Sequence, residues 1–581
     1  IVAGYNNLST SYHQDASGYH YGLGVCPWVK VGSSVIFDPS YTSPNFVTLQ
    51  SDAYASGVRI STNSWGQSYP DGSYNSNSQT YDTCVRDAQS GTGGNQEMVI
   101  VFSAGNGGSG ANTIGAPGTA KNVFSIGAAE NVNPFGGADA SGIGDSGSDN
   151  ANDIISFSSR GPCDDGRIKP DIQAPGTHIG GGVFQIASPP VGGQADACFD
   201  GSGVSGGPSG SHFWPTTQQW TTASSGTSHS CPAMAGASAL LRQWFLNHSL
   251  AAPSPAMNKA FLMNSTRYMT GAGANDTLPS NNQGMGEVDL TRAFDAVPRV
   301  MIDQAQVFTA SGQNRTITGN VQDAGQPFRV TLAWTDPPGP TSGNAYINNL
   351  DLTVTVGGVT YLGNVFSGAN SATGGTADLK NNVESVFVPA GVTGAYTVTI
   401  TATNIAGDGV PGNGTPLDQD YALVIYNATE VQQPVMNGQS AELEQEDCVP
   451  GNSEPDPGEA VTYTITLKNV GTAATSNLVA TLQATGGVTS PGSPQTYGVI
   501  ATGASASRPF SFIVDPELVC GGSLTLTLQL NDGATDLGQV TFGPILTGVD
   551  ATITFLTQNF DGVTPPALPA NWQKADTSGF D

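Results

Sequence analysis

The order of apolar and polar positions divides the chain into an α/β part followed by an all-β part. Residues 79–88 place four apolar side chains on one face of a predicted helix: Tyr81, Cys84, Val85 and Ala88. Residues 98–102 are an unbroken apolar run of the kind found in central parallel strands, and residues 35–37 predict a short strand. Because a helix lies between strands, we predict an α/β domain with a parallel sheet over residues 1–297.

From residue 298 the pattern changes to short runs in which apolar and polar residues alternate. Such runs predict β-strands and are found at residues 328–335, 351–356, 381–386, 396–400, 461–467 and 524–530. We therefore expect all-β sandwich domains over residues 298–430 and 431–547, the second of them immunoglobulin-like. Residues 548–581 have the pattern of a further β module, which we expect to be cut off at Asp581.

The charge balance narrows the classes of partner. Lys and Arg number 18 against 46 Asp and Glu, a net charge of -28, which disfavours nucleic acid and anionic membranes as partners. Apolar runs stay well short of the roughly 20 residues that a membrane-spanning helix needs. Only 11% of residues are charged and 76 are Gly, a composition that favours a secreted, extracellular protein with β-rich modules.

The seven cysteines cannot all pair within one chain, because their number is odd. Cys163 with Cys198, and Cys448 with Cys520, are the pairs that would close a loop or clamp a module. The sequence leaves this connectivity open. We expect Cys26 and Cys231 to act as small buried apolar residues.

Ser228 is the candidate nucleophile. It follows Gly226 and Thr227 and precedes the apolar run at residues 238–245, so its hydroxyl would lie on the first turn of a buried helix. The free amides and the positive dipole end of such a helix can stabilise an anion as it forms. On the tripeptide alone, a serine that only caps the helix is the commoner interpretation.

Asn106 directly follows the apolar strand at residues 98–102. Ligands of open parallel sheets gather at the carboxyl ends of strands, so this position favours a site residue. Because Asn106 precedes Gly107, a simple turn is the alternative.

The run from Gly226 to Gly236 resembles, without a gap, the nucleophile motif of subtilisin-like serine proteases. His229 stands where that family usually has Met, and Ala233 where it usually has His. The resemblance implies a three-layer subtilisin-like domain, with Ser228 as nucleophile and Asn106 as the oxyanion-hole amide. Further stretches similar to the family are residues 59–66, 154–162, 165–176 and 283–290. The resemblance to the family also implies a peptide-binding cleft lined by Ser64, Trp65, Gly66, Ala104 and Gly105.

The family's catalytic Asp and His should both precede the nucleophile, each in its own motif. Neither motif is present, since none of the six histidines stands in His-Gly-Thr-His and Asp145 lacks an apolar strand before it. Residues 1–7 and 22–27 resemble the segment that comes after the catalytic His in the family. We therefore expect an N-terminally truncated fragment, inactive alone, of a full-length serine endopeptidase that acts on proteins or peptides. The alternative is a surface adhesion or binding protein with a degenerate protease domain.

Residues 298–430 resemble the jelly-roll or P-domain-like sandwich that follows the catalytic domain in some secreted subtilases. Three carboxylates in this block are candidates for a structural calcium site: Asp351, Asp378 and Glu384. Solvated turn carboxylates are the interpretation that we favour. We expect no cofactor for catalysis, and a surface or a glycan is the candidate partner of the β modules.

Overall fold

The computed structural model describes residues 1–9, 13–37, 41–134, 136–183, 214–215, 220–448, 451–519, 521–548, 563–564, 567–568 and 572. By its internal contacts the chain forms two compact units, residues 1–431 and 432–581. No helix in the described part is both long enough and apolar enough to cross a membrane.

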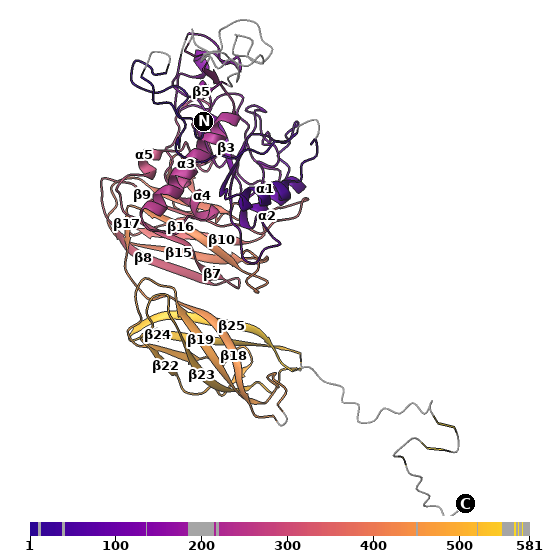
Figure 1. The fold of residues 1–581 in the computed structure, drawn as a ribbon. Coiled ribbons are helices and arrows are strands. Elements are labelled where there is room, and N and C mark those ends of the chain that lie inside the picture. The colour runs from indigo at the N-terminus through magenta and orange to yellow at the C-terminus, as the bar shows by residue number, and fades with distance from the viewer. Residues whose placement is uncertain are drawn as a thin grey trace, which may run out of the picture. The chain divides into compact units, whose positions relative to one another are not determined.

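A four-stranded parallel sheet forms the centre of the α/β part (Figure 1). Its strands, in spatial order, are β1 (Ile60–Asn63), β2 (Val99–Ser103), β3 (Phe124–Ala129) and β4 (Ile172–Pro175). Every residue of β2 and β3 is buried, as expected for strands covered on both faces. The parallel sheet predicted from the apolar run at residues 98–102 is therefore confirmed.

Helices cover both faces of this sheet. The covering helices are α1 (Phe46–Ala55) and α2 (Ser76–Arg86) on one face, with α3 (Thr227–Asn247) and α4 (Pro255–Asn264) on the other. Side chains of β2 alternate between the two layers, so that Ile100 and Phe102 pack against α2 while Val99 and Val101 pack with α3 and α4. This arrangement confirms the three-layer fold and the predicted apolar face of α2.

Shorter elements complete the α/β part: η1 (Asp145–Gly147), β5 (Ile179–Gly182), β6 (Thr221–Ser224) and α5 (Leu290–Ala293). Residues 35–37 are not a strand, so that prediction was wrong. Val35 and Phe37 are largely exposed, so these residues do not pack in a sheet. Phe37 also has φ 58°, which is incompatible with a β-strand.

The first β module, residues 298–431, contains two antiparallel sheets whose facing side chains form one core. One sheet has the order β11-β10-β15-β8-β17 and the other β14-β9-β16-β7. Their strands are β7 (Arg299–Phe308), β8 (Asn314–Val321), β9 (Phe328–Ala333), β10 (Asn349–Val356), β11 (Val359–Leu362), β14 (Val383–Val388), β15 (Gly394–Asn404), β16 (Gln419–Tyr426) and β17 (Ala428–Glu430). A small hairpin pairs β12 (Phe366–Ser367) with β13 (Asn370–Ser371).

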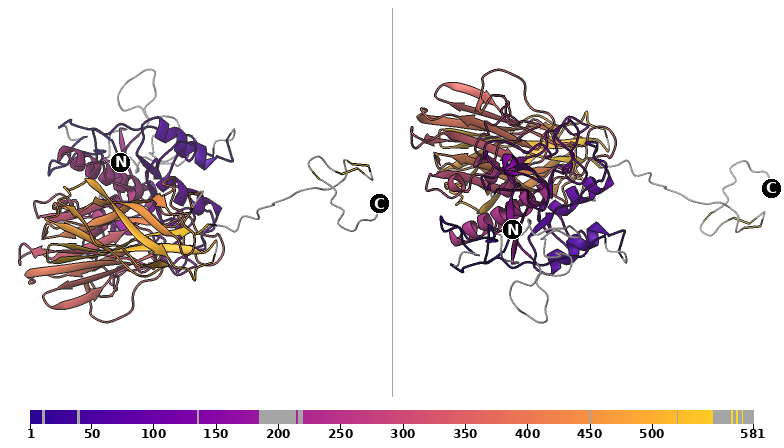
Figure 2. Two further views of the ribbon diagram at one scale, coloured as in Figure 1. Left: turned by 90° about the horizontal axis from the view of Figure 1, so that it is seen from below. Right: turned by 90° about the horizontal axis from the view of Figure 1, so that it is seen from above.

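The α/β part and the first β module share a hydrophobic core. All ten residues of α4 are buried, because the parallel sheet lies on one side of the helix and strands β9 and β16 lie on the other. Every residue of β14 and β16 is buried as well, so this sheet is covered on both faces. Figure 2 shows the same ribbon from below and from above.

The second β module lies within residues 432–548 and also has two antiparallel sheets around one core. Its strands are β18 (Met436–Glu446), β19 (Ala460–Asn469), β20 (Leu478–Leu482), β21 (Val488–Thr489), β22 (Gln495–Gly498), β23 (Ser505–Val514), β24 (Ser523–Asp532) and β25 (Thr535–Leu546). In β19 and β24 alternate residues are buried, which confirms the predicted alternation.

Candidate active site

Ser228 is the second residue of α3, directly after the helix begins. Gly226 caps the helix with φ 151°, a conformation that side chains rarely adopt, and its amide donates to the carbonyl of Gly176 at 2.8 Å. Ser228 is half-buried, so its hydroxyl stays accessible beside the first amides of the helix. The helix N-terminus therefore favours negative charge next to the Ser228 side chain.

Pro232 releases the carbonyl of Ser228 from the helix. In a regular helix this carbonyl would accept from the amide four residues on, but residue 232 is proline and has no N–H. Ser64 Oγ donates to the Ser228 carbonyl instead, at 2.9 Å. The segment after β1 is thus tied to the backbone of the candidate nucleophile.

Asn106 is held in one orientation by Thr227. The amide and the hydroxyl of Thr227 both donate to Asn106 Oδ1, at 3.0 and 2.8 Å, and the amide of Gly105 donates to Thr227 Oγ1 at 3.2 Å. Because a backbone N–H can only donate, the Asn106 atom that faces it must be the oxygen. The two N–H donors of Asn106 Nδ2 are therefore directed away from Thr227.

One pocket of about 260 Å³ brings the predicted site residues together. Its wall includes Ser228 and Asn106 with the five predicted cleft residues: Ser64, Trp65, Gly66, Ala104 and Gly105. The remaining lining residues are Gln67, Ser68, Pro70, Ser103, Gly107, Gly115 and Thr227. No acidic or basic side chain is among these described lining residues, so the pocket suits an uncharged group.

The ring of Trp65 packs into an aromatic cluster. It stacks on Phe46 at a centroid distance of 4.7 Å and meets Phe102 edge-on at 5.3 Å, while its Nε1 donates to Asn63 Oδ1 at 3.3 Å. This packing anchors the Ser64–Gly66 segment to α1 and β2. The order of apolar residues along the chain does not predict this cluster, because its members come from separate elements, Phe46 from α1 and Phe102 from β2.

The segment before Ser228 is fixed by buried Asp139. Its carboxylate accepts from Ser225 Oγ and from the amides of Ser141 and Ile143, the latter two at 2.8 and 3.1 Å. The hydroxyl of Ser141 in turn donates to the Ser225 carbonyl at 2.9 Å. Sequence reasoning misses Asp139, since a loop aspartate carries no distinguishing pattern.

A base for Ser228 is not found among the histidines that the structure describes, none of which has a hydrogen bond to Ser228. His229 is the neighbour of Ser228 in sequence, and its Nδ1 is buried without a hydrogen-bond partner among the described residues. Burial lowers the pKa of His229, and the nearby carboxylate of Asp139 opposes this shift. In Figures 1 and 2 the N label, which marks Ile1, lies beside α3.

The three calcium candidates lie in different hydrogen-bonded settings. Asp378 accepts from the amides of Lys380 and Asn381 and from two side-chain amides, and Asp351 accepts from Thr403 Oγ1 at 2.6 Å. Burial raises the pKa of Glu384 well above its usual value, although a calcium ligand must be ionised. In the described part of the chain, the ligand atoms of these three residues do not converge on one point. Calcium binding here stays a prediction, and no step of the proposed reaction depends on it.

A different group of ligand atoms does converge, those of Glu446, Cys448 and Glu459. Glu459 accepts from the amides of Cys448 and Asp456, at 3.0 and 2.9 Å, and Glu446 accepts from the amide of Ser453 at 3.0 Å. These carboxylates hold the loop between β18 and β19 in shape.

Cys231 is fully buried below the site, and burial raises the pKa of its thiol to about 11, which confirms it as a small buried residue. Cys26 is only half-buried. Cys198 and Cys520 lie outside the described residues, so both proposed pairings stay predictions.

Comparison with known proteins gives a consistent result for the α/β part. The sequence model of the subtilase family, Peptidase S8, matches residues 1–286. The chain is 28% identical over 297 residues to "Serine protease/ABC transporter B family protein tagA" of Dictyostelium discoideum. This alignment covers 46% of this chain and 15% of that protein. It is 37% identical over 82 residues to "Serine protease AprX" of Bacillus subtilis (strain 168), which covers 14% of this chain and 16% of that protein.

Among solved structures, the chain is similar to sphericase with a TM-score of 0.26 and 22% identity, over 42% of this chain and 61% of that one. In the sequence comparisons, the chain spans only 15% of the length of two Dictyostelium relatives, both of them serine protease/ABC transporter B family proteins.

Proposed function

Since residues 1–286 form a subtilase-family domain, we propose that the full protein is a secreted serine endopeptidase that forms an acyl-enzyme on Ser228. The observation that carries this proposal is the fixed orientation of Asn106 in the pocket that Ser228 also lines. A hydroxyl at a helix N-terminus and a donor amide in one uncharged pocket suit attack on a peptide carbonyl.

In the proposed reaction, Ser228 Oγ attacks the carbonyl carbon of the peptide while its proton passes to a base. The carbonyl oxygen becomes an oxyanion, which accepts from Asn106 Nδ2 and from the amide of Ser228. Collapse of this intermediate breaks the C–N bond, and the protonated base returns its proton to the leaving amine. Water then repeats the attack on the acyl group and regenerates the hydroxyl.

We infer that the base is a histidine oriented by an aspartate, and that both come from a part of the protein outside these 581 residues. The support for this inference is that no histidine in the described part of the chain has a hydrogen bond to Ser228, while His212 lies outside the described residues.

The substrate class follows from the exposed segment after β1. In the described part of the chain β1 is an outer strand of the parallel sheet, and the Ser64–Gly66 segment continues from it into the pocket. An exposed extended segment of this kind binds an extended peptide through main-chain hydrogen bonds, whatever its sequence. Peptides and proteins are accordingly the proposed substrates. A surface or glycan ligand for the β modules also remains a proposal.

An active-site serine phosphonate tests the proposed function. The full protein should react covalently at Ser228, as located by peptide mass mapping, and should hydrolyse peptides. Folded full protein that reacts at no serine and cleaves no peptide would refute the assignment and leave the adhesion alternative.

A bulky residue at position 115 should change which side chain is accepted before the cleaved bond. A Cβ at Gly115 would lie 3.4 Å from both Pro70 Cβ and Gln67 O, and these residues line the same pocket. In the full protein we expect Gly115→Val to lower kcat/KM for phenylalanine peptides by about 10-fold or more relative to alanine peptides. Competition assays with the two peptides measure this ratio.

Gly110→Val is the matched control, because Gly110 is exposed and lies outside the pocket lining. It should keep the wild-type ratio. Equal ratios for both variants would show that position 115 does not limit the pocket.

A further inference from the structure

A buried segment connects the substrate pocket with the first β module. Gly115 lines the pocket, and the carbonyl of the next residue, Ala116, accepts from the amide of Gln67 at 2.8 Å. Two consecutive turns come next, closed by the amides of Gly118 and Ala120 at 2.8 and 2.9 Å. All residues from 114 to 130 are buried, so the segment passes through the core without reaching solvent.

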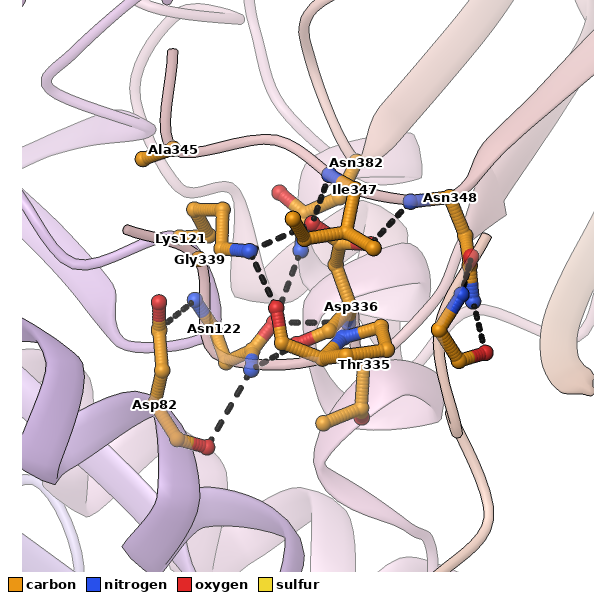
Figure 3. Close-up of polar contacts among 12 residues, drawn as sticks. Asp82, Lys121, Asn122, Thr335, Asp336, Gly339, Ala345, Ile347, Asn348 and Asn382 are labelled. Carbon is orange, nitrogen blue, oxygen red and sulfur yellow. Dashed lines mark hydrogen bonds and ion pairs between the residues drawn. The ribbon is translucent and has the colours of Figure 1, made fainter. Parts of the chain in front are cut away.

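The segment leads to Lys121 and Asn122, which contact Asp336 in the loop after β9 (Figure 3). Lys121 Nζ donates to Asp336 Oδ2 at 2.5 Å, and both side chains are 1% exposed. The amides of Ile347 and Asn348 donate to the same carboxylate, at 3.0 and 2.7 Å. Asp336, in the loop after β9, therefore joins the buried segment that contains Lys121 to the stretch of the first β module that contains Ile347 and Asn348.

Asn122 bonds both to α2 and to the first β module. Its Oδ1 accepts from the amide of Asp336 at 2.9 Å, and its Nδ2 donates to the Asp336 carbonyl at 2.8 Å. Its own amide donates to Asp82 Oδ1 in α2 at 2.7 Å, while Asn382 Nδ2 also donates to Asn122 Oδ1, at 3.1 Å. Figure 3 shows Asn122 between Asp82 and Asp336.

We propose that Asp336 is a positioning residue for the substrate pocket, so that the first β module helps to set which side chain the protease accepts. This inference rests on the proposed function of the same site. The carboxylate of Asp336 fixes Lys121, and its backbone amide and carbonyl fix Asn122. These two residues fix the turns at 115–120, and the turns place Gly115 against Gln67 and Pro70. A buried ion pair adds little net stability, because desolvation offsets the attraction, whereas it specifies one arrangement of its partners.

Asp336→Asn in the full protein tests the proposal with little change in side-chain shape. The amide cannot keep Lys121 Nζ and both backbone donors in place. We expect the ratio of kcat/KM for phenylalanine peptides to that for alanine peptides to change by roughly 2- to 30-fold. Most of the change should be in KM, since Ser228 and Asn106 are not moved.

Asp420→Asn is a matched control. Asp420 of β16 pairs with Arg86 of α2 at 2.6 Å, and this buried ion pair also joins the first β module to the α/β part. Arg86 lies outside residues 114–122. Asp420→Asn should therefore lower the Tm and keep the wild-type ratio. If Asp336→Asn likewise changes only the Tm, Asp336 has a purely structural role and the proposal is refuted.

A milder variant covers the case in which Asp336→Asn does not accumulate as folded protein. Asn382→Ala removes one donor from Asn122 Oδ1 and leaves the ion pair intact. It should change the same peptide ratio, and an unchanged ratio in this variant refutes the proposal. Full protein that neither reacts with the phosphonate nor cleaves peptides refutes the proposed function as well. An active enzyme with unchanged ratios refutes only the role of Asp336.

Discussion

Replacing Ser228 with alanine in the full protein is expected to lower kcat by about 10⁴-fold or more and to abolish reaction with the serine phosphonate. Without the hydroxyl no acyl-enzyme can form, and only binding and the oxyanion donors remain to assist direct attack by water. For a protease of this family, removal of the nucleophile costs about 10⁶ in kcat, which sets the scale of the expectation. Progress curves with a peptide substrate and mass mapping of the labelled protein measure the two effects.

Ser230→Ala is the matched control for this experiment. Ser230 lies two residues further along α3, is fully buried, and its Oγ has no hydrogen-bond partner among the described residues. Its removal should leave kcat within about 3-fold of the wild type, because a hydroxyl without a partner contributes little to a neighbouring site. Retained hydrolysis in Ser228→Ala would instead place the nucleophile elsewhere.

The parts of the fold that were predicted correctly are those with local signals. The apolar face of α2 and the buried run of β2 follow from spacing along a few residues, since each element packs on neighbours in its own layer. Ser228 and Asn106 were assigned through the resemblance of the run from Gly226 to Gly236 to the subtilisin-like motif, because the glycine turns beside them fit a helix cap and a simple turn equally well. Pro232, four residues after Ser228, also marks the freed carbonyl that Ser64 binds.

Contacts between distant segments had no such signal. Lys121 and Asp336 are 215 positions apart, and neither the lysine nor the aspartate is unusual in its local context. The burial of α4 on all sides likewise depends on β9 and β16, which fold from residues far along the chain. The strand predicted at residues 35–37 was wrong because three apolar residues in a row satisfy the local pattern even where no sheet lies beside them.

Asn106→Asp should lower kcat by about 10²- to 10³-fold and change KM little, the loss measured for removing one oxyanion-hole donor in a member of this family. The substitution keeps Oδ1, which accepts from the amide and hydroxyl of Thr227, and replaces only the donor Nδ2 with an oxygen. A negative charge there also opposes the developing oxyanion. Steady-state kinetics on a peptide substrate in the full protein give both constants.

Thr227→Val distinguishes the contribution of the Asn106 Nδ2 donor from that of the Thr227 hydroxyl, which orients the Asn106 side chain. This variant removes the hydroxyl that donates to Asn106 Oδ1 and accepts from the Gly105 amide, but it keeps the Thr227 amide, so the Asn106 side chain retains one of its two donors. We expect a smaller fall in kcat, about 10-fold, because the hydrogen bond that Asn106 loses contributes roughly 1 kcal/mol. A larger loss in Thr227→Val than in Asn106→Asp would contradict the assignment, since support for a donor cannot matter more than the donor. Wild-type kcat in Asn106→Asp would show that the oxyanion is held by other groups.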